Sequence, residues 1–260
     1  MRKILCAALA FAVFAPALAA QESNDPKNQL TRDEVAVFKK KLVTALDAMG
    51  LPPAGFAKQK DDFSLPTEFY KEKGKLVSNQ CYASRKLAIK GVRDAENATK
   101  QASIDYQKKV LEAQAKGDYQ EMTRLMQEMQ QKTSETTLAG MQAQQDKKEP
   151  IAVEVHLNRS EYQAIDPDMV VFEKPGVLAL KTQQGDEGDP KETVTVYFQP
   201  VVLKDTKNLS QIEIKTGPVP AKTSVSSLSI EIEGPAADVE AWAKRINTDK
   251  VLALVDATVK

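Results

Sequence analysis

The spacing of apolar residues changes near Glu149 and Pro150, and this change constrains the fold more than any other feature of the chain. Before this point apolar side chains recur every three or four positions, which is the period of an amphipathic helix. After it they alternate with polar side chains, which is the period of a half-buried strand. The sequence therefore predicts an α+β protein that is helical first and β-rich second.

The first helix is predicted to begin after Thr31. Thr31 and Glu34 have the spacing of a capping box, in which each side chain bonds the backbone N–H of the other residue. The apolar residues that follow share one helical face: Val35, Phe38, Leu42 and Leu46. Gly50 ends the helix. Residues 54–63 have no apolar period, and we expect a loop there.

The longest helical pattern is predicted to form an antiparallel hairpin of two helices. Ser64 is suited to cap a helical segment, and small or apolar residues recur at helical spacing most clearly over 76–115. Gly117 breaks the pattern, and Asp118 is placed to cap a second helix that ends near Gln145. Because the break is short, the two helices are expected to pack against each other. The seam is predicted to set alanines of the first helix against methionines of the second.

The second half is predicted to form a mainly antiparallel sheet that carries one short helix. Alternating or β-branched residues mark six strands: 152–158, 169–172, 177–181, 193–203, 211–215 and 228–233. Gly234 and Pro235 are expected to open the helix, with Val239 and Trp242 on its buried face. A closing strand is predicted over 251–255, and it would complete a right-handed crossover if it ran parallel to 228–233.

These patterns divide the chain into four segments. They are a signal peptide (1–20), an N-terminal helix and loop (21–63), a long helical hairpin (64–149) and a β-rich α+β domain (150–260).

The first twenty residues have the organisation of a secretory signal peptide. A positive start, Arg2-Lys3, precedes an apolar run over 4–14 that is too short to span a bilayer. Small residues then predict cleavage near Ala19 or Ala20. An uncleaved anchor is the alternative, against which the short apolar run argues. The rest of the chain contains no apolar stretch of spanning length, so we expect a periplasmic or secreted protein without a transmembrane segment.

The charge balance of the chain bears on the class of its partner. After signal removal, 34 Lys and Arg stand against 36 Asp and Glu, a balance that gives no support to nucleic-acid binding. Residues 21–149 carry 22 positive and 19 negative side chains, whereas 150–260 carry 12 and 17. This asymmetry reflects either chance or a basic half that meets an acidic partner or envelope surface.

Cys81 is the cysteine that remains after signal removal, so an intramolecular disulfide is excluded. We expect a buried thiol in the helix seam, with an intermolecular disulfide as the alternative. His156, the single histidine, is expected on the exposed polar side of its strand beside Glu154. A Cys81–His156 dyad would be the one nucleophile–base pair of that type, but no local signature surrounds either residue.

Motifs for catalysis and for cofactors are missing from the sequence. It contains no Gly-rich phosphate loop, GxSxG, HExxH or CxxC, and it predicts no cofactor. The acidic stretch 184–190 is rich in oxygen ligands that calcium prefers, but it lacks EF-hand spacing. A solvated hairpin loop is the simpler interpretation of this stretch.

Three methionines of the predicted second helix, Met122, Met126 and Met129, recur at i, i+4 and i+7. Thioethers can bind Cu(I), yet Tyr119 and Leu125 fall on or beside the same face, as in a packing seam. A partner surface formed by Met122, Met126 and Met129 is the alternative to packing, because methionine adapts to varied apolar partners. Self-association through the hairpin is a further expectation.

Three classes of function follow. The first is a non-catalytic binding or scaffold protein with a protein partner in the cell envelope. The second is a chaperone-like holdase that grips unfolded proteins with the methionine-rich hairpin. The third is an enzyme whose site has no recognisable motif, which the missing motifs make the weakest of the three.

Overall fold

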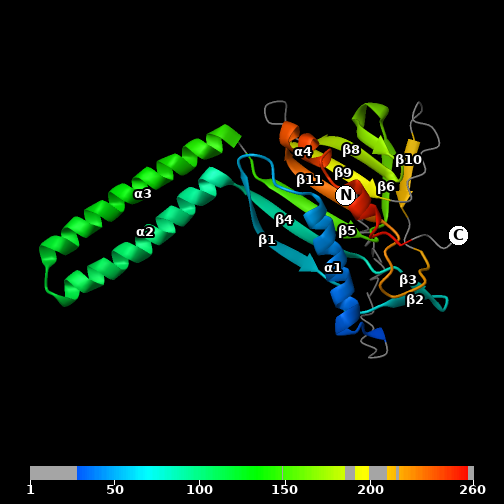
Figure 1. Ribbon diagram of the computed structural model, residues 1–260, viewed down its shortest axis with the longest axis horizontal. Coiled ribbons are helices and arrows are strands. Elements are labelled where there is room, and N and C mark those ends of the chain that lie inside the picture. The colour runs from blue at the N-terminus through cyan, green and yellow to red at the C-terminus, as the bar shows by residue number, and fades with distance from the viewer. Residues whose placement is uncertain (1–27, 148, 185–190, 199–209, 215–216, 257–260) are drawn as a thin grey trace, which may run out of the picture.

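A seven-stranded antiparallel sheet forms the centre of the computed structural model (Figure 1), which describes residues 28–147, 149–184, 191–198, 210–214 and 217–256. Its strands are, in spatial order, β1 (Phe56–Ser64), β4 (Cys81–Ile89), β5 (Ile151–Leu157), β11 (Leu228–Pro235), β9 (Lys191–Phe198), β8 (Val177–Gln184) and β7 (Val170–Lys174). Each neighbouring pair is antiparallel. The predicted α+β class is confirmed.

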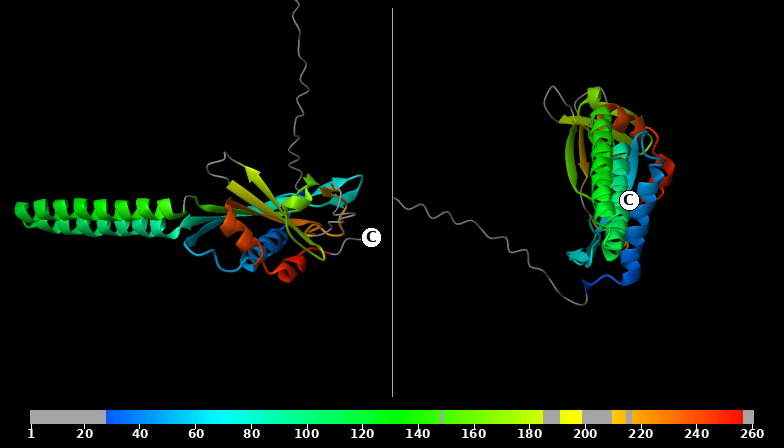
Figure 2. Two further views of the ribbon diagram at one scale, coloured as in Figure 1. Left: turned by 90° about the horizontal axis from the view of Figure 1, so that it is seen from above. Right: turned by 90° about the vertical axis from the view of Figure 1, so that its left-hand side faces the viewer.

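Three helices cover one face of this sheet, namely α1 (Arg32–Ala48), α4 (Ala236–Ala243) and α5 (Thr248–Leu252) (Figures 1 and 2). The main core lies between these helices and the inward side chains of the strands. Its largest members include Phe38, Leu42, Leu87, Leu157 and Trp242. The indole Nε1 of Trp242 donates to the backbone oxygen of Met49 at 3.0 Å, which ties α4 to the end of α1.

The opposite face of the sheet is covered over part of its area by a two-stranded ribbon of β6 (Glu161–Ile165) and β10 (Ser210–Ile214). Beneath the ribbon lies a second, smaller core, made by Ile165, Leu178, Leu180, Tyr197 and Ile214. A short 3-10 helix, η2 (Pro167–Met169), leads from β6 to β7. A separate two-stranded hairpin, β2 (Tyr70–Glu72) and β3 (Lys75–Val77), precedes β4.

The predicted helical hairpin is confirmed, and it projects from the sheet as an arm (Figures 1 and 2). It consists of α2 (Lys90–Ala115) and α3 (Tyr119–Lys147), which pack along each other. The Asp118 carboxylate caps α3 by accepting from the backbone N–H of Glu121 at 3.0 Å. The arm connects β4 to β5, which are neighbouring strands of the sheet. It is therefore an insertion into a β-hairpin.

The helical segment predicted to follow Ser64, most clearly over 76–115, is wrong in its first part. Ser64 ends strand β1, and β2, β3 and β4 follow it before α2 begins at Lys90. Side chains of β4 alternate between buried and more exposed positions, the period of a strand. One buried position holds Arg85, and this charge hides the apolar alternation in the sequence. Small residues such as Ala83 and Ala88 are compatible with both periods, so the helical spacing of the arm continues into the sequence of this strand.

The loop predicted over 54–63 is also wrong, because strand β1 occupies residues 56–64. This strand lies at the edge of the sheet, and its single fully buried side chain is Phe56. A register shift between Lys58 and Asp61 interrupts its pairing with β4. An edge strand with so little burial has no apolar period to detect.

The predicted closing strand over 251–255 is wrong as well. Helix α5 lies at Thr248–Leu252, capped by Asn247, whose side-chain oxygen accepts from the backbone N–H of Lys250 at 3.1 Å. The right-handed crossover predicted with it is therefore not formed. Of the strand predicted over 193–203, the structure describes β9 up to Phe198, and the remainder lies outside the described residues.

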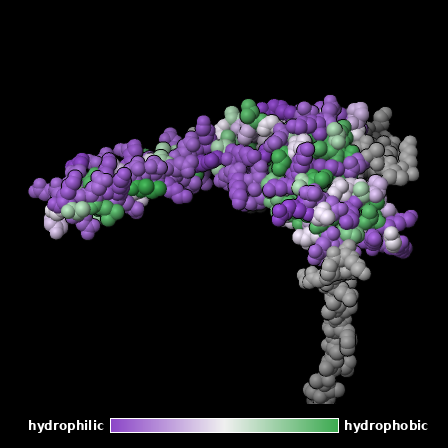
Figure 3. All heavy atoms as spheres, turned by 60° about the horizontal axis from the view of Figure 1, so that its bottom comes forward, coloured by the Kyte–Doolittle hydropathy of each residue, from purple (hydrophilic) through white to green (hydrophobic). Residues whose placement is uncertain are grey.

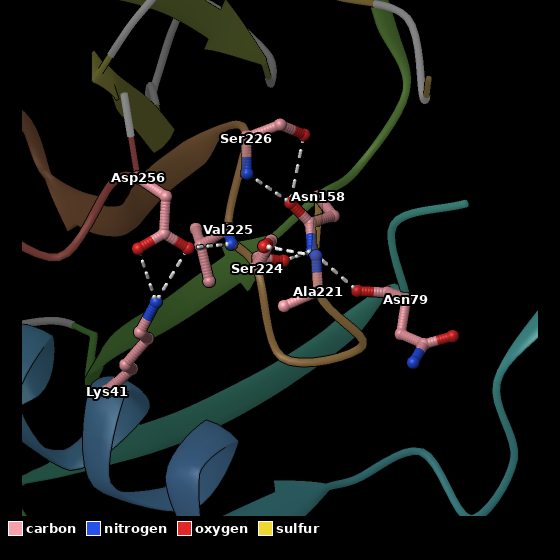
Figure 4. A network of polar contacts seen from close by, with 8 residues as sticks. All are labelled: Lys41, Asn79, Asn158, Ala221, Ser224, Val225, Ser226 and Asp256. Carbon is pink, nitrogen blue, oxygen red and sulfur yellow. Dashed lines mark hydrogen bonds and ion pairs between the residues drawn. The ribbon is translucent and has the colours of Figure 1, made fainter. Parts of the chain in front are cut away.

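A buried amide at the end of strand β5 holds three separated segments together (Figure 4). Asn158, at φ 59°, donates to the backbone oxygens of Asn79 at 2.8 Å and Ser224 at 3.0 Å. Its own side-chain oxygen accepts from the backbone N–H of Ser226 at 2.7 Å. An amide with both donors and its acceptor satisfied fixes the loop before β11 against the end of β5.

A second polar contact in the same region fastens the end of the described chain (Figure 4). The carboxylate of Asp256 accepts from the backbone N–H of Val225 at 2.6 Å and pairs with Lys41 of α1 at 3.0 Å. The chain after α5 is thereby tied both to the loop before β11 and to the first helix.

Candidate functional site

The seam between α2 and α3 is built from small residues near the base of the arm. A Cβ added to Gly91 would lie 2.4 Å from the Cβ of Ala143, and one added to Gly140 would lie 3.2 Å from that of Ala95. The hydroxyls of Thr99 and Thr136 share a hydrogen bond of 2.6 Å across the seam. The two helices therefore approach closely here but bury few apolar atoms.

The outer half of the seam is larger and more apolar. Leu125 is 3% exposed and Ala113 is 5% exposed, and they are the fully buried hydrophobic side chains among the described residues of the arm. Met122 and Met129 are half-buried beside them. An arm of two helices thus has two buried apolar side chains of its own, a small core for its length.

Large apolar side chains remain exposed along one side of the arm. Five lie on or near this side, each more than half exposed: Ile104, Leu111, Tyr119, Met126 and Met141. Leu111 and Met126 line a hollow of about 320 Å³ between the helices. Met141 lines a larger hollow of about 710 Å³ nearer the base. Tyr119 precedes Met126 by seven residues, about two helical turns, and so shares its side. Ile104 precedes Leu111 by the same spacing and lies near the outer edge of this side.

We call this side of the arm the groove face, defined by the two hollows and these five residues. The exposed Leu138 lies at its outer edge, facing away from α2. Figure 3 shows hydrophobic residues in patches on the projecting arm, surrounded by hydrophilic ones. The groove face is the candidate site.

The opposite side of the arm, which we call the charged face, carries acidic and basic side chains in pairs. Arg124 pairs with both Glu121 and Glu128, and Lys132 lies 3.5 Å from Glu135. The hydrogen bond from Arg124 lowers the pKa of Glu121, and Lys109 of the neighbouring helix contributes. Such exposed pairs stabilise a helix only slightly, but they mark a surface that water solvates well.

The groove face differs from the charged face in its polar residues too. Its charges, such as Glu96 and Lys100, lie near the base. In the outer half of the described arm, the polar residues on this side are amides and hydroxyls: Ser103, Gln107, Gln114, Thr123, Gln130 and Thr133. In its outer half the arm therefore separates an apolar, uncharged face from a charged one.

The three methionines singled out from the sequence do not all lie in the seam. Met122 and Met129 are half-buried between the helices, whereas Met126 is 56% exposed at the hollow of the groove face. Tyr119, predicted to pack with them, is 77% exposed. A partner surface that includes these methionines stays a prediction. The sequence did not single out Ile104, Leu111 and Met141, although their helical spacing from the seam residues could have placed them outside the seam.

Cys81 lies in β4, not in a helix, and points into the main core with 5% exposure. Burial raises the pKa of its thiol to about 12. Cys81 pairs with Leu157, the residue after His156. Because neighbouring residues of a strand point to opposite faces, the thiol and the imidazole lie on opposite sides of the sheet. The structure does not bring the Cys81–His156 pair together, and a disulfide between two copies would require the core to open.

His156 belongs to a polar cluster that the sequence did not reveal. Its ring lies 5.7 Å from that of Tyr82, and its Nε2 lies 3.1 Å from a carboxylate oxygen of Glu154. It lies on the polar side of β5, but its side chain is only 13% exposed, so the predicted exposure is wrong. Burial lowers the pKa of His156, and the positive charge of Arg159 lowers it further. The environment thus favours a neutral imidazole.

The same cluster continues towards the ribbon. Arg159 pairs with Glu231 at 3.1 Å, and the hydroxyl of Tyr197 donates to Glu161 at 2.6 Å. Burial raises the pKa of Tyr197, and the carboxylate of Glu161 raises it further. In the described part of the chain, no three His, Cys, Asp or Glu side chains are grouped as a metal site. The acidic stretch 185–190 lies outside the described residues.

Comparisons with known proteins found no match: no protein-family model matches the chain, and neither a curated protein nor a solved structure matches significantly. None of the described helices combines the length and the apolar character needed to cross a bilayer.

Proposed function

We propose that the chain is an exported, non-catalytic binding or scaffold protein of the cell envelope, and that the groove face of its arm holds a protein partner. Export rests on residues 1–20, which have the pattern of a signal peptide. The binding role rests on one observation, the separation of the arm into an apolar groove face and a charged face.

Two physical arguments support this role. Exposed apolar side chains gathered on one side, next to hollows, are typical of interaction surfaces and not of solvated helices. The arm also extends away from the sheet, so a partner can reach the groove face without contacting the rest of the molecule (Figure 2). The sheet module then serves as the rigid base that positions the arm.

Site-specific photo-crosslinking in living cells tests the proposal. A photoreactive residue at Leu111 samples the groove face, and one at Ala98, which is exposed on the charged face, is the matched control. We expect a discrete adduct from position 111 and none from position 98. The absence of any adduct at 111, or the same adducts from both positions, would contradict the proposal.

A holdase is the second candidate, favoured by the exposed Met126 and Met141 on the groove face. Flexible thioether side chains adapt to many apolar sequences, as a protein that holds unfolded chains requires. A holdase would suppress aggregation of a diluted, urea-unfolded outer-membrane protein at near-equimolar ratio. A chain that leaves the aggregation rate unchanged is not a holdase.

A further inference from the structure

We infer that the partner of the groove face is a second copy of this chain, so that two arms pack into a four-helix bundle. This inference rests on the proposed function, because it names the protein that the groove face holds.

The first argument is that the arm lacks a sufficient core. Near the base of the arm the two helices contact each other through Gly91, Gly140 and two threonines. In the outer half they bury Ala113 and Leu125. Most stability of helices in proteins comes from packing of an apolar face, not from helix propensity. Long helices with so small a seam are expected to be covered by another element, and the exposed side chains lie on the groove face.

The second argument is that the groove face is complementary to itself. In a two-fold symmetric dimer the same surface is used by both copies, so charges on it would meet like charges near the axis. The outer half of the groove face avoids this repulsion, since it presents Gln107, Gln130 and Thr133 in place of charges. Amides and hydroxyls carry both donors and acceptors, and each can therefore pair with its own kind. The charged face has no such property.

The third argument is size. Helix α2 has 26 residues, and at a rise of about 1.5 Å per residue it is about 40 Å long. Two helices of about 10 Å diameter give the groove face a width of about 20 Å, or about 800 Å² per copy. Pairing two such faces would bury about 1,600 Å², the size of a standard specific interface. The groove between two helices is also the place where further helices pack in a bundle.

Sedimentation equilibrium of the full mature chain tests the inference. Interfaces of this size have dissociation constants in or below the micromolar range, so we expect a dimer at concentrations of about 1–100 µM. The double variant L111K/M126K places two charges in the buried centre of the bundle and should weaken the dimer at least about 100-fold. The control A98K/A139K adds the same charge to exposed positions outside the groove face, and it should remain dimeric.

Two further measurements keep the test decisive. Circular dichroism establishes that both lysine variants retain their helices, and the milder variant L111A/M126A, which adds no charge, should weaken the dimer about 10-fold. A monomeric wild-type chain, or a lysine variant as dimeric as its control, would overturn the inference.

Photo-crosslinking from position 111 separates this inference from the proposed function. An adduct of two copies of the chain supports both. An adduct with a different protein overturns the inference but leaves the proposed function standing. No adduct overturns both.

Discussion

Arg85 is buried between helix α1 and strand β1 and binds both. Its guanidinium makes two hydrogen bonds to Asp61, at 2.8 and 2.9 Å, and a third to the backbone oxygen of Leu46 at 2.9 Å. Burial raises the pKa of Asp61, but the hydrogen bonds from Arg85 and Lys58 outweigh it, so that the pKa is lowered overall. One side chain therefore connects the first helix to the edge strand of the sheet.

Replacing Arg85 with methionine should destabilise the fold by about 3 kcal/mol, because the carboxylate of Asp61 keeps only its contact with Lys58 and the oxygen of Leu46 loses the guanidinium donor. Urea unfolding measures this change. The double variant R85M/D61N removes the negative charge that Arg85 neutralised and should recover part of the loss. A single variant within about 0.5 kcal/mol of the wild type would show that the contacts contribute little.

His156 should make stability depend on pH near neutrality. Because burial lowers its pKa in the folded state, the unfolded chain takes up the proton first as the pH falls through about 6.5. The folded state therefore loses stability as the pH falls from about 7 towards the folded pKa. Urea unfolding at about pH 7.5 and about pH 5.5 should show a larger loss for wild type than for H156Q. An identical loss in both proteins would contradict this account.

At the scale of elements, the arm shows how small residues decide where helices meet. Gly91 costs helix propensity, yet it stands where α2 comes closest to Ala143 of α3. The hydroxyl pair of Thr99 and Thr136 continues the same close seam. The two helices can therefore approach closely because glycine, which has no side chain, stands at the contact.

The variant G91A should loosen the base of the arm, although alanine raises helix propensity by up to about 1 kcal/mol. The added Cβ would lie 2.4 Å from the Cβ of Ala143, which forces the helices apart. Hydrogen exchange of amides 92–99 should be faster in G91A and return towards wild type in G91A/A143G. Slower exchange in G91A would mean that propensity outweighs packing at this site.

At the scale of the whole molecule, the arm is an insertion between two strands that already pair. Leu87 of β4 pairs with Ile151 of β5, so the two strands are hydrogen-bonded up to the point where the arm begins. The main core uses residues on both sides of the arm, from Phe38 of α1 to Trp242 of α4. The core does not depend on the outer part of the arm.

Replacing residues 90–149 with a short glycine-containing turn should leave a folded sheet module, because antiparallel neighbours can be joined by a tight hairpin. We expect cooperative thermal unfolding, and we expect dimerisation to be lost. Circular dichroism and sedimentation check the two expectations. A non-cooperative transition would show that the arm contributes to the core of the module.

The sequence alone determined the features that depend on near neighbours in the chain. The capping box of Thr31 and Glu34 is present as predicted, with hydrogen bonds of 2.7 and 3.2 Å. The cap at Asp118, the alternation of β5 and the buried face of Trp242 were equally readable. The helical hairpin was predictable from the cap at Asp118 and from the apolar periods of three and four residues on either side of it, because these periods depend only on near neighbours in the chain.

Tertiary structure decided the features that depend on distant segments. Strand β4 forms because it pairs with β5, which follows it in the sequence only after the whole arm. Its inward Arg85 finds hydrogen-bond partners in Asp61 and Leu46, which lie in other elements. Strand β1 and the half-burial of His156 likewise arise from contacts between separate elements. The groove face belongs to the same category: each helix carries part of it, and only their packing brings Leu111 and Met126 to one hollow.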